Sequence, residues 1–176
     1  MTRRPSRRRF LSVAGVAPVV IPRRVLAQDG APGANDKIGV GYIGTGRRSG
    51  QLRALPSDGR IVGMADCNLP RAESNAARYK CPSHQNYHAM LERSDVDAVI
   101  VATPDHWHAI PSIHAMMAGK HVYCEKPMTL TIREGRVMVD AARKYKVVCQ
   151  CGSQQRSMSA NRFGCELVRN GVLGRI

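Results

Sequence analysis

Short apolar runs alternate along the chain with stretches whose apolar residues recur at helical spacing. The apolar runs predict strands near 37–43, 60–65, 97–103, 120–124 and 146–151. The amphipathic stretches predict helices near 47–55, 69–80, 87–93, 107–118, 131–144 and 160–170. Strands that alternate with helices usually pair in parallel through helical crossovers. The pattern therefore predicts an α/β fold, a doubly wound parallel sheet covered on both faces.

Individual segments support this fold. The run over residues 96–102 consists almost entirely of β-branched and small residues, as expected of a central strand. In the helix expected over 131–144, Ile132, Val139 and Ala142 can face the sheet. Arg133, Arg136 and Arg143 then remain exposed to water. Gly171 is well placed to cap the last helix.

The first expected strand ends on glycines, in the order Gly44-Thr45-Gly46, and Asp66 closes the next strand twenty positions later. A residue without Cβ lets the backbone turn sharply and approach a pyrophosphate at the start of the following helix, while the acid receives ribose hydroxyls. Ser49 stands at the third glycine position of this fingerprint, a mild departure. The pattern predicts a Rossmann dinucleotide site, and the alternative is a glycine-rich turn that packs helix on strand.

Two further features concern the same site. Arg47 and Arg48 begin a predicted helix, where positive charge opposes the macrodipole, so a bound pyrophosphate or simple solvation must offset them. Asp66 favours NAD over NADP because a carboxylate repels a 2′-phosphate, although Arg71 is close enough in sequence to weaken that preference.

At 176 residues the chain has room for one domain and a leader. Residues 1–27 hold seven arginines and no acid, so +7 of the total charge of +14 belongs to the remainder. That remainder has no aromatic platform or recognition motif for nucleic acid. The expected organisation is a signal peptide over 1–27, a linker rich in Gly, Ala, Pro and Asn over 28–36, and the nucleotide-binding domain over 37–176.

The leader has the features of a twin-arginine signal. Ser6-Arg7-Arg8-Arg9-Phe10-Leu11-Ser12 precedes a moderately apolar run that ends near Ile21, and Val25-Leu26-Ala27 offers small residues for cleavage. The run is too short to span a bilayer, although an anchor or a nucleic-acid arm is the alternative. Because this route carries folded proteins, a cofactor can be loaded before export. We expect a periplasmic or secreted mature protein that starts near Gln28.

The cysteines and histidines suggest neither a disulfide framework nor a metal centre. Cys124, Cys149 and Cys151 fall in strand-like runs, where cysteine is usually a small buried hydrophobe, although an oxidising compartment would permit disulfides. No pair of Cys-x-x-Cys units is present to hold zinc. Only His84 and His88 have a helical metal-ligand spacing, and they lack an obvious third ligand; His106, His108 and His114 have none.

Polar segments follow two later strands. Thr103-Pro104-Asp105-His106-Trp107-His108 follows the central strand, and Glu125-Lys126-Pro127 follows the next. Ligands of such sheets bind at the carboxyl ends of the strands, so these side chains should border the cofactor. A lysine held there can hydrogen-bond a substrate hydroxyl and stabilise the alkoxide as hydride leaves carbon. A surface Glu-Lys pair before a turn is the alternative.

Taken together, these motifs resemble the Gfo/Idh/MocA oxidoreductases, named for glucose-fructose oxidoreductase and inositol dehydrogenase. The resemblance covers most of residues 37–176 and also includes Ala118-Gly119-Lys120-His121-Val122 and Gly152-Ser153-Gln154-Gln155-Arg156. It implies that NAD(P) is the cofactor, that Glu125 and Lys126 lie next to the nicotinamide ribose, and that Lys126 is catalytic. The cofactor site expected from all these motifs comprises Gly44, Thr45, Gly46, Arg47, Arg48, Asp66, Thr103, Pro104, His108, Glu125 and Lys126.

The resemblance also implies a sugar, glycoside or cyclitol substrate. Family members continue into a second α/β domain that supplies the substrate pocket, a catalytic histidine and the oligomer interface, and this chain stops where that domain would begin. We therefore expect part of an exported NAD-dependent dehydrogenase, with homo-oligomers only where the second domain is present. An NAD-dependent glycosidase of the same fold and a non-catalytic nucleotide-binding module are the alternatives.

Overall fold

A computed structural model describes residues 36–175 of the chain. The predicted signal peptide and all but the last residue of the predicted linker lie outside the described residues. Every strand and helix reported below belongs to one unit, Ile38–Ile176. None of the helices between residues 36 and 175 combines the length and the apolar character needed to cross a bilayer.

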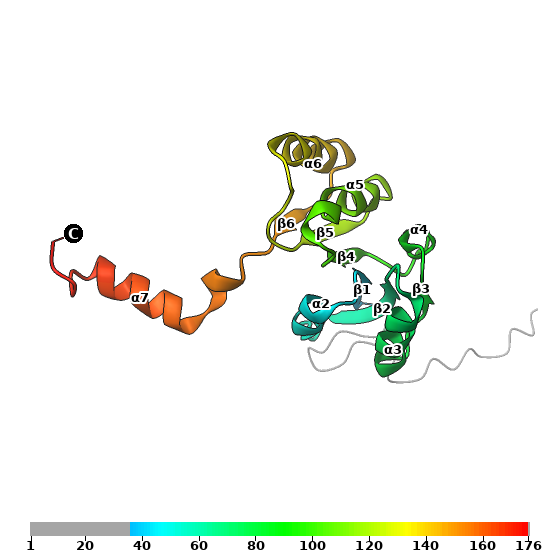
Figure 1. The fold of residues 1–176 in the computed structure, drawn as a ribbon, viewed down its shortest axis with the longest axis horizontal. Helices are drawn as coiled ribbons and strands as arrows, with labels where there is room; N and C mark the ends of the chain where they lie inside the picture. The colour runs from blue at the N-terminus through cyan, green and yellow to red at the C-terminus, as the bar shows by residue number, and fades with distance from the viewer. Residues whose placement is uncertain (1–35, 176) are drawn as a thin grey trace, which may run out of the picture. The chain divides into compact units, whose positions relative to one another are not determined.

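The described strands form one parallel sheet with the order β3-β2-β1-β4-β5-β6 (Figure 1). Their bounds are β1 Ile38–Ile43, β2 Gly59–Ala65, β3 Ser83–His84, β4 Ala98–Val101, β5 His121–Cys124 and β6 Cys149–Cys151. This is the order of a doubly wound dinucleotide-binding sheet, with the switch point between β1 and β4. The predicted fold class is confirmed, and only the two-residue strand β3 was missed because it is too short to show a period.

The helices are α2 Arg47–Gln51, α3 Leu69–Tyr79, α4 Tyr87–Leu91, α5 Ala109–Met117, α6 Ile132–Tyr145 and α7 Ser159–Arg169. Two 3₁₀ turns, η2 Asp105–Trp107 and η3 Gln154–Ser157, precede α5 and α7. Each predicted helix is present. Helix α5 begins two residues later than expected because η2 forms first, directly after Pro104.

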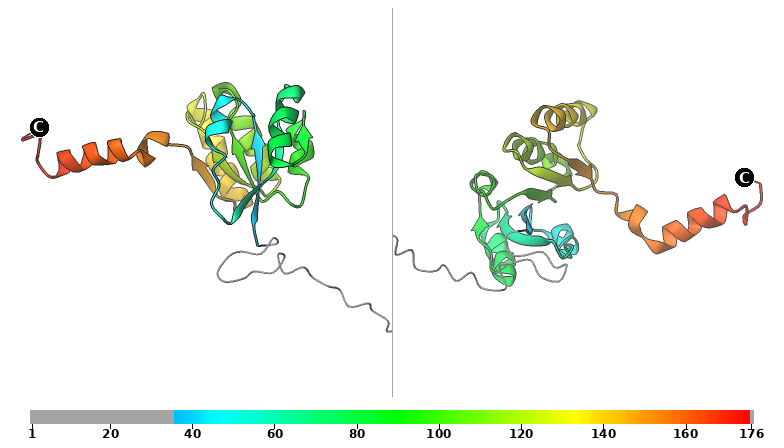
Figure 2. Two further views of the ribbon diagram at one scale, coloured as in Figure 1. Left: turned by 90° about the horizontal axis from the view of Figure 1, so that it is seen from below. Right: turned by 180° about the vertical axis from the view of Figure 1, so that it is seen from behind.

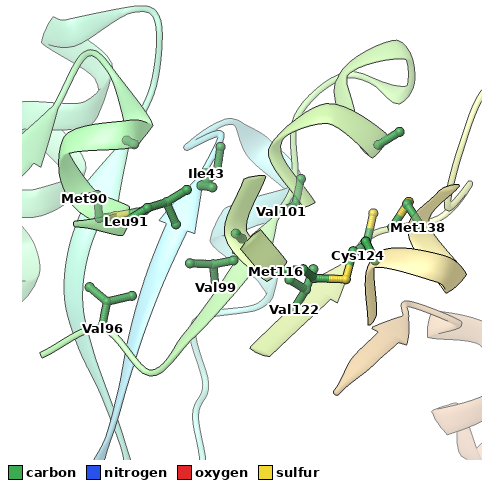
Figure 3. Packing of buried hydrophobic residues seen from close by; sticks show 14 of the residues in the cluster. Ile43, Met90, Leu91, Val96, Val99, Val101, Met116, Val122, Cys124 and Met138 are labelled. Carbon is green, nitrogen blue, oxygen red and sulfur yellow. The ribbon is translucent and has the colours of Figure 1, made fainter. Parts of the chain in front are cut away.

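Side chains on the two faces of the sheet form separate cores. On one face, Val99, Val101 and Val122 pack against α4, α5 and α6, and Met116 and Met138 are fully buried there (Figure 3). On the other face, Tyr42, Met64 and Ile100 pack with Ala76 of α3. Figures 1 and 2 show α5 and α6 together over one face.

Local signals set the ends of several helices. The Asn68 side chain accepts a hydrogen bond from the backbone N–H of Arg71 at the start of α3. Thr131 and Glu134 form a capping box at the start of α6. At the end of α7, Gly171 has a φ of 71°, which confirms its predicted capping role.

One orientation within α6 was predicted wrongly. Ile132 is 94% exposed, whereas Met138 and Ala141 are the buried residues of this helix. Ala141 follows Ile132 by nine residues, which is about two and a half turns at 3.6 residues per turn, so the two side chains lie on opposite faces. Val139 and Ala142 are half-buried, and the three arginines of this helix are exposed as predicted.

Candidate functional site

The segments that follow β1, β4 and β5 meet at one edge of the sheet. Ile43 lies opposite Val101 in the strand register, and Val101 lies opposite Cys124. Gly44, Ala102 and Glu125 therefore leave the sheet at the same level. A cavity of about 350 Å³ opens beside this edge, and six of its lining residues were predicted from the sequence: Arg47, Arg48, Thr103, His108, Glu125 and Lys126.

Gly44 and Gly46 of the glycine loop differ in how much space surrounds them. Gly44 has a φ of 84°, and a Cβ built there would lie 2.7 Å from the carbonyl oxygen of Ala102. Glycine is therefore needed at this position for the packing of the loop against the end of β4. A Cβ on Gly46 would meet no atom within 4 Å. The space above Gly46 is open, as an approaching ligand would require.

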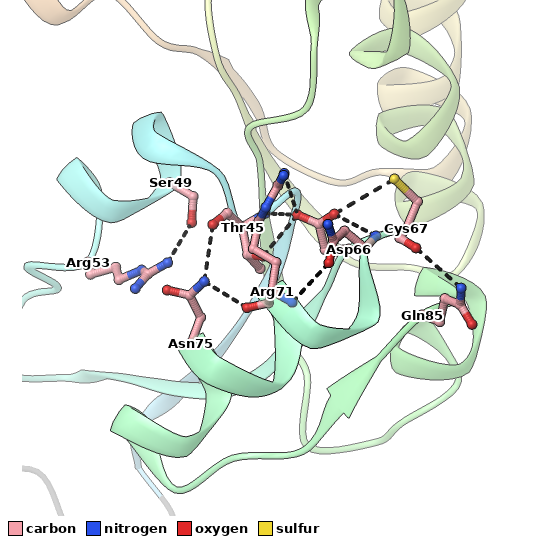
Figure 4. Close-up of polar contacts among 9 residues, drawn as sticks. Thr45, Ser49, Arg53, Asp66, Cys67, Arg71, Asn75 and Gln85 are labelled. Atoms are coloured by element: carbon pink, nitrogen blue, oxygen red, sulfur yellow. Dashed lines mark hydrogen bonds and ion pairs between the residues drawn. The ribbon is translucent and has the colours of Figure 1, made fainter.

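Thr45 and Asp66 join the glycine loop to the end of β2 (Figure 4). Asp66 Oδ2 accepts hydrogen bonds from the Thr45 backbone N–H at 2.8 Å and from its hydroxyl at 2.9 Å, while Oδ1 accepts from the Asn68 N–H at 2.9 Å. Burial alone would raise the pKa of Asp66, but these hydrogen bonds and the charge of Arg71 outweigh it and lower that pKa. Asp66 is therefore ionised, and its hydrogen bonds hold Thr45 of the glycine loop at the end of β2.

Arg48 and Glu125 form an ion pair across the switch point. Arg48 Nη2 lies 2.7 Å from Glu125 Oε1, and the exposed fractions of their side chains are 25% and 3%. Glu125 Oε2 also accepts from the Lys126 backbone N–H at 3.1 Å. Burial acts to raise the pKa of Glu125, but Arg48 and that N–H lower it overall. The structure therefore gives Arg48 a protein carboxylate, in addition to any pyrophosphate predicted to offset its charge.

Lys126 lies at the rim of this cavity. Its side chain is exposed, and its Nζ donates no hydrogen bond and forms no ion pair within residues 36–175. The peptide bond from Lys126 to Pro127 is cis. Because Glu125 is engaged by Arg48, the two neighbouring residues have separate tasks: the carboxylate holds the glycine-loop helix, and the ammonium group faces the cavity.

His108 is buried behind the same cavity, with both ring nitrogens directed at backbone carbonyls. Nδ1 lies 2.5 Å from the Pro127 oxygen and Nε2 lies 2.9 Å from the Thr103 oxygen. These contacts tie the segment after β4 to the segment after β5, so His108 positions the cavity wall and its nitrogens are occupied. The Thr103 hydroxyl donates to the Trp107 carbonyl oxygen, and Pro104 is exposed beside it.

A second cavity, of about 540 Å³, lies on the other side of the glycine loop. Thr45, Gly46 and Arg47 line it from the loop, and Arg53, Arg71 and Arg78 add three further guanidinium groups. The sequence analysis singled out Arg71 here but missed Arg53, Asn75 and Arg78. In the first cavity, Gln51 and Ala102 were not predicted, Gln154 was noted only as part of the resemblance, and Asp105 lies in the segment that was expected to border the cofactor. Single polar residues on exposed helix faces carry no sequence signal of this kind.

The cysteines and histidines add no metal centre in the described part of the chain, where no three ligating side chains gather. All six cysteines carry free thiols. Cys124 is buried as predicted, and burial is the main cause that raises its pKa to about 12. Cys149 is half-buried, and the burial prediction was wrong for Cys151, which is exposed, because β6 is the edge strand.

The residues present fit a dinucleotide. The Gly46 position leaves room for a ligand, and the first turn of α2 has neither a side-chain cap nor an acidic residue. The two cavities lie on either side of this loop and share Arg47. A ligand that crosses the loop would therefore contact both, as a pyrophosphate joining two nucleosides does.

Comparisons with known proteins agree with this geometry. Residues 38–153, more than half of the chain, match the model of the GFO_IDH_MocA family, described as an oxidoreductase family with an NAD-binding Rossmann fold. Glucose-6-phosphate 3-dehydrogenase of Bacillus subtilis is 30% identical over 140 residues, 78% of this chain and 39% of the relative. A glycosyl hydrolase family 109 protein of Shewanella pealeana is 26% identical over 201 residues, 97% of this chain and 44% of the relative.

Among solved structures, the 3-ketoreductase KijD10 from Actinomadura kijaniata in complex with NADP superposes with a TM-score of 0.73. It is 30% identical, and the match covers 80% of this chain and 46% of that one. The chain thus spans less than half the length of these relatives.

Proposed function

This chain belongs to the GFO_IDH_MocA oxidoreductase family, and from that premise we propose that it is the NAD(P)-binding part of an enzyme that oxidises or reduces a sugar, glycoside or cyclitol. The supporting observation is the cavity at the carboxyl ends of β1, β4 and β5, where the ion pair between the partly exposed Arg48 and the buried Glu125 stands beside the unpaired ammonium group of Lys126. When bound, the nicotinamide supplies the hydride acceptor or donor.

Residues of this chain surround the nicotinamide site and assist the reaction there. The Lys126 ammonium group donates a hydrogen bond to the reacting substrate oxygen and stabilises the negative charge that develops there. Glu125 stays ionised through Arg48, and its hydrogen bond from the Lys126 N–H fixes the backbone that carries the ammonium group. His108 and the segment after β4 form the cavity wall that positions Glu125 and Lys126.

We also propose export by the twin-arginine route to the periplasm or medium, on the Arg7-Arg8-Arg9 pattern and the cleavage-like residues before Gln28. We propose a small carbohydrate as the substrate. We expect a homo-oligomer only where the second domain is present. N-terminal sequencing of the exported protein tests this: a mature start near Gln28 supports export, and an intact leader contradicts it.

The enzymatic proposal is tested in two steps. Calorimetric titration of the purified chain with NAD and NADP should show saturable binding of at least one of them. In the full-length protein, Lys126→Ala should then lower turnover by about a hundredfold or more and leave the cofactor dissociation constant within about threefold. Arg133→Ala, on the exposed face of α6, is the matched loss of one positive charge and should change neither. Unchanged turnover in Lys126→Ala would remove this assignment.

A second function, NAD-dependent glycoside hydrolysis, is favoured by the similarity to the Shewanella protein across 97% of this chain. In that reaction the cofactor is reduced and reoxidised within each cycle. Accumulation of NADH with an oxidised sugar indicates a dehydrogenase, whereas release of free sugar without net NADH indicates a glycosidase. Dinucleotide binding without turnover on a sugar panel would indicate a binding module.

A further inference from the structure

Three cysteines lie at neighbouring positions on the last two strands of the sheet. Cys124 is the last residue of β5, and Cys149 and Cys151 are the first and last residues of β6. In the register of these parallel strands Cys151 is the partner of Cys124, whereas the partner of Cys149 is Val122. None of these thiols takes part in the proposed hydride transfer.

The three side chains share one face of the sheet. Cys124 is fully buried in the cluster that α5 and α6 cover, and Figure 3 shows it among those side chains. Cys149 packs against the same cluster. Side chains two positions apart on a strand point to the same face, so Cys151 lies on the face of Cys149 and Cys124.

Strand spacing selects one pair among the three. Neighbouring strands lie about 4.7–4.9 Å apart, and disulfides join residues whose Cα atoms are about 4.4–6.8 Å apart. The register partners Cys124 and Cys151 meet this requirement. Cys124 and Cys149 are offset by two residues as well as one strand, about 8 Å, which is too far. Cys149 and Cys151 are about 6.6 Å apart along one strand, at the far end of the range.

The two thiols of the selected pair differ in access to solvent. Cys151 is exposed, whereas Cys124 is 0% exposed. Burial is the main cause that raises the pKa of Cys124 to about 12, so this thiol is a poor first nucleophile at neutral pH. Cys151 also ends the edge strand β6, where a small movement of one residue leaves the rest of the sheet in place. A reagent from solvent therefore meets Cys151 first.

We propose that Cys151 and Cys124 form a reversible disulfide that fastens the end of β6 to the end of β5. The Cys151 thiol loses its proton and attacks one sulfur of a small-molecule disulfide, RSSR, and the expelled RS⁻ takes up a proton. Cys124 then loses its proton and attacks Sγ of Cys151 in the mixed disulfide, and the second RS⁻ is expelled and protonated. Two protein thiols are oxidised and RSSR is reduced to two RSH. An oxidising compartment supplies reagents of this class.

The crosslink lies directly beside the candidate active site. Glu125 and Lys126 follow Cys124, and the Gly152 N–H donates to the Cys124 carbonyl oxygen at 2.7 Å. A Cβ on Gly152 would lie 3.0 Å from Glu125 Oε1, so the two strand ends are already in close contact there. Because β6 has only three residues, the disulfide would mainly prevent its detachment from β5.

The test treats the purified full chain with oxidised glutathione, blocks the remaining thiols with iodoacetamide and maps the linked peptides by tandem mass spectrometry. Cys67 and Cys165, which are exposed, are replaced by serine throughout so that they cannot react. The peptide with Cys124 should be linked to the peptide with Cys151. Cys151→Ser should abolish this link, and the matched control Cys149→Ser should retain it. Far-UV circular dichroism checks that each variant is folded.

Unfolding in urea tests the fastening. Oxidation should raise the midpoint by about 1 M in the parent and in Cys149→Ser, and dithiothreitol should reverse the shift; Cys151→Ser should show none. A link between Cys149 and Cys151, glutathione retained on Cys151 without a crosslink, no reaction, or an unchanged midpoint would each overturn the proposal. NAD(P) binding has no part in this experiment, so each of these outcomes leaves the proposed function intact.

Discussion

Removing the Arg48 guanidinium should destabilise the domain through Glu125. In Arg48→Ala a carboxylate whose side chain is 3% exposed loses the donor that stood 2.7 Å away. Breaking a fully buried ion pair from one side costs about 3–5 kcal/mol. Here a quarter of the Arg48 side chain is already in water and the Lys126 N–H still serves Glu125, so we expect a loss near the value of one hydrogen bond to a charged group, about 2 kcal/mol.

The pH dependence of that loss tests its cause. The pKa of folded Glu125 lies below its ordinary value of 4.5, so the contribution of its charge is present above pH 4.5 and is lost as the pH falls through the lowered pKa. Without Arg48, two of the causes that lower this pKa are lost, while burial, the largest cause, still raises it, so the pKa of Glu125 should increase. The deficit of Arg48→Ala should therefore be largest at pH 7 and clearly smaller at pH 4, when Glu125 takes up a proton.

Urea unfolding followed by far-UV circular dichroism at both pH values measures this deficit. Arg133→Ala provides the control, because an exposed arginine on α6 should change the free energy of unfolding by no more than about 0.5 kcal/mol at either pH. A deficit in Arg48→Ala that is below about 0.5 kcal/mol, or that is equal at pH 4 and pH 7, would refute the reasoning.

Four further predictions concern other parts of the domain. Gly44→Ala should cost more than about 2 kcal/mol in urea unfolding, because φ is 84° and its Cβ would contact the Ala102 carbonyl oxygen. Gly46→Ala should leave unfolding within about 0.5 kcal/mol yet weaken NAD(P) in calorimetry; normal binding would contradict an open ligand path. Asp66→Asn should lose about 1–2 kcal/mol at pH 7. It should also flatten the acid side of the stability curve, since the pKa of Asp66 is lowered below 3.8 and its contribution disappears as the pH falls; an unchanged curve would contradict this. Met116→Ala should cost about 2–5 kcal/mol by leaving a cavity under α5, and a loss below 1 kcal/mol would show that the core closes around it.

Most of the fold could be predicted from local patterns in the sequence. Continuous apolar runs identified the strands of a sheet covered on both faces, and helical periodicity identified the helices between them. The glycine at position 44 reflects a backbone angle that other residues avoid, and the segments after β4 and β5 had to emerge at the ligand edge because parallel strands end together. The exposed Ile132 shows the limit of this reasoning: periodicity defines an apolar stripe but not which part of it contacts the sheet.

The sequence by itself determined the elements, their parallel arrangement and the edge at which chemistry can occur, because each depends on neighbours within one turn or one strand. Only the tertiary structure decided which side chains lie next to one another. Arg48 meets Glu125 across 77 positions, and arginines from two separate helical segments surround one cavity, because the strand order and crossovers bring them together. Such pairings depend on where whole elements pack, and no short-range pattern of residue types records that.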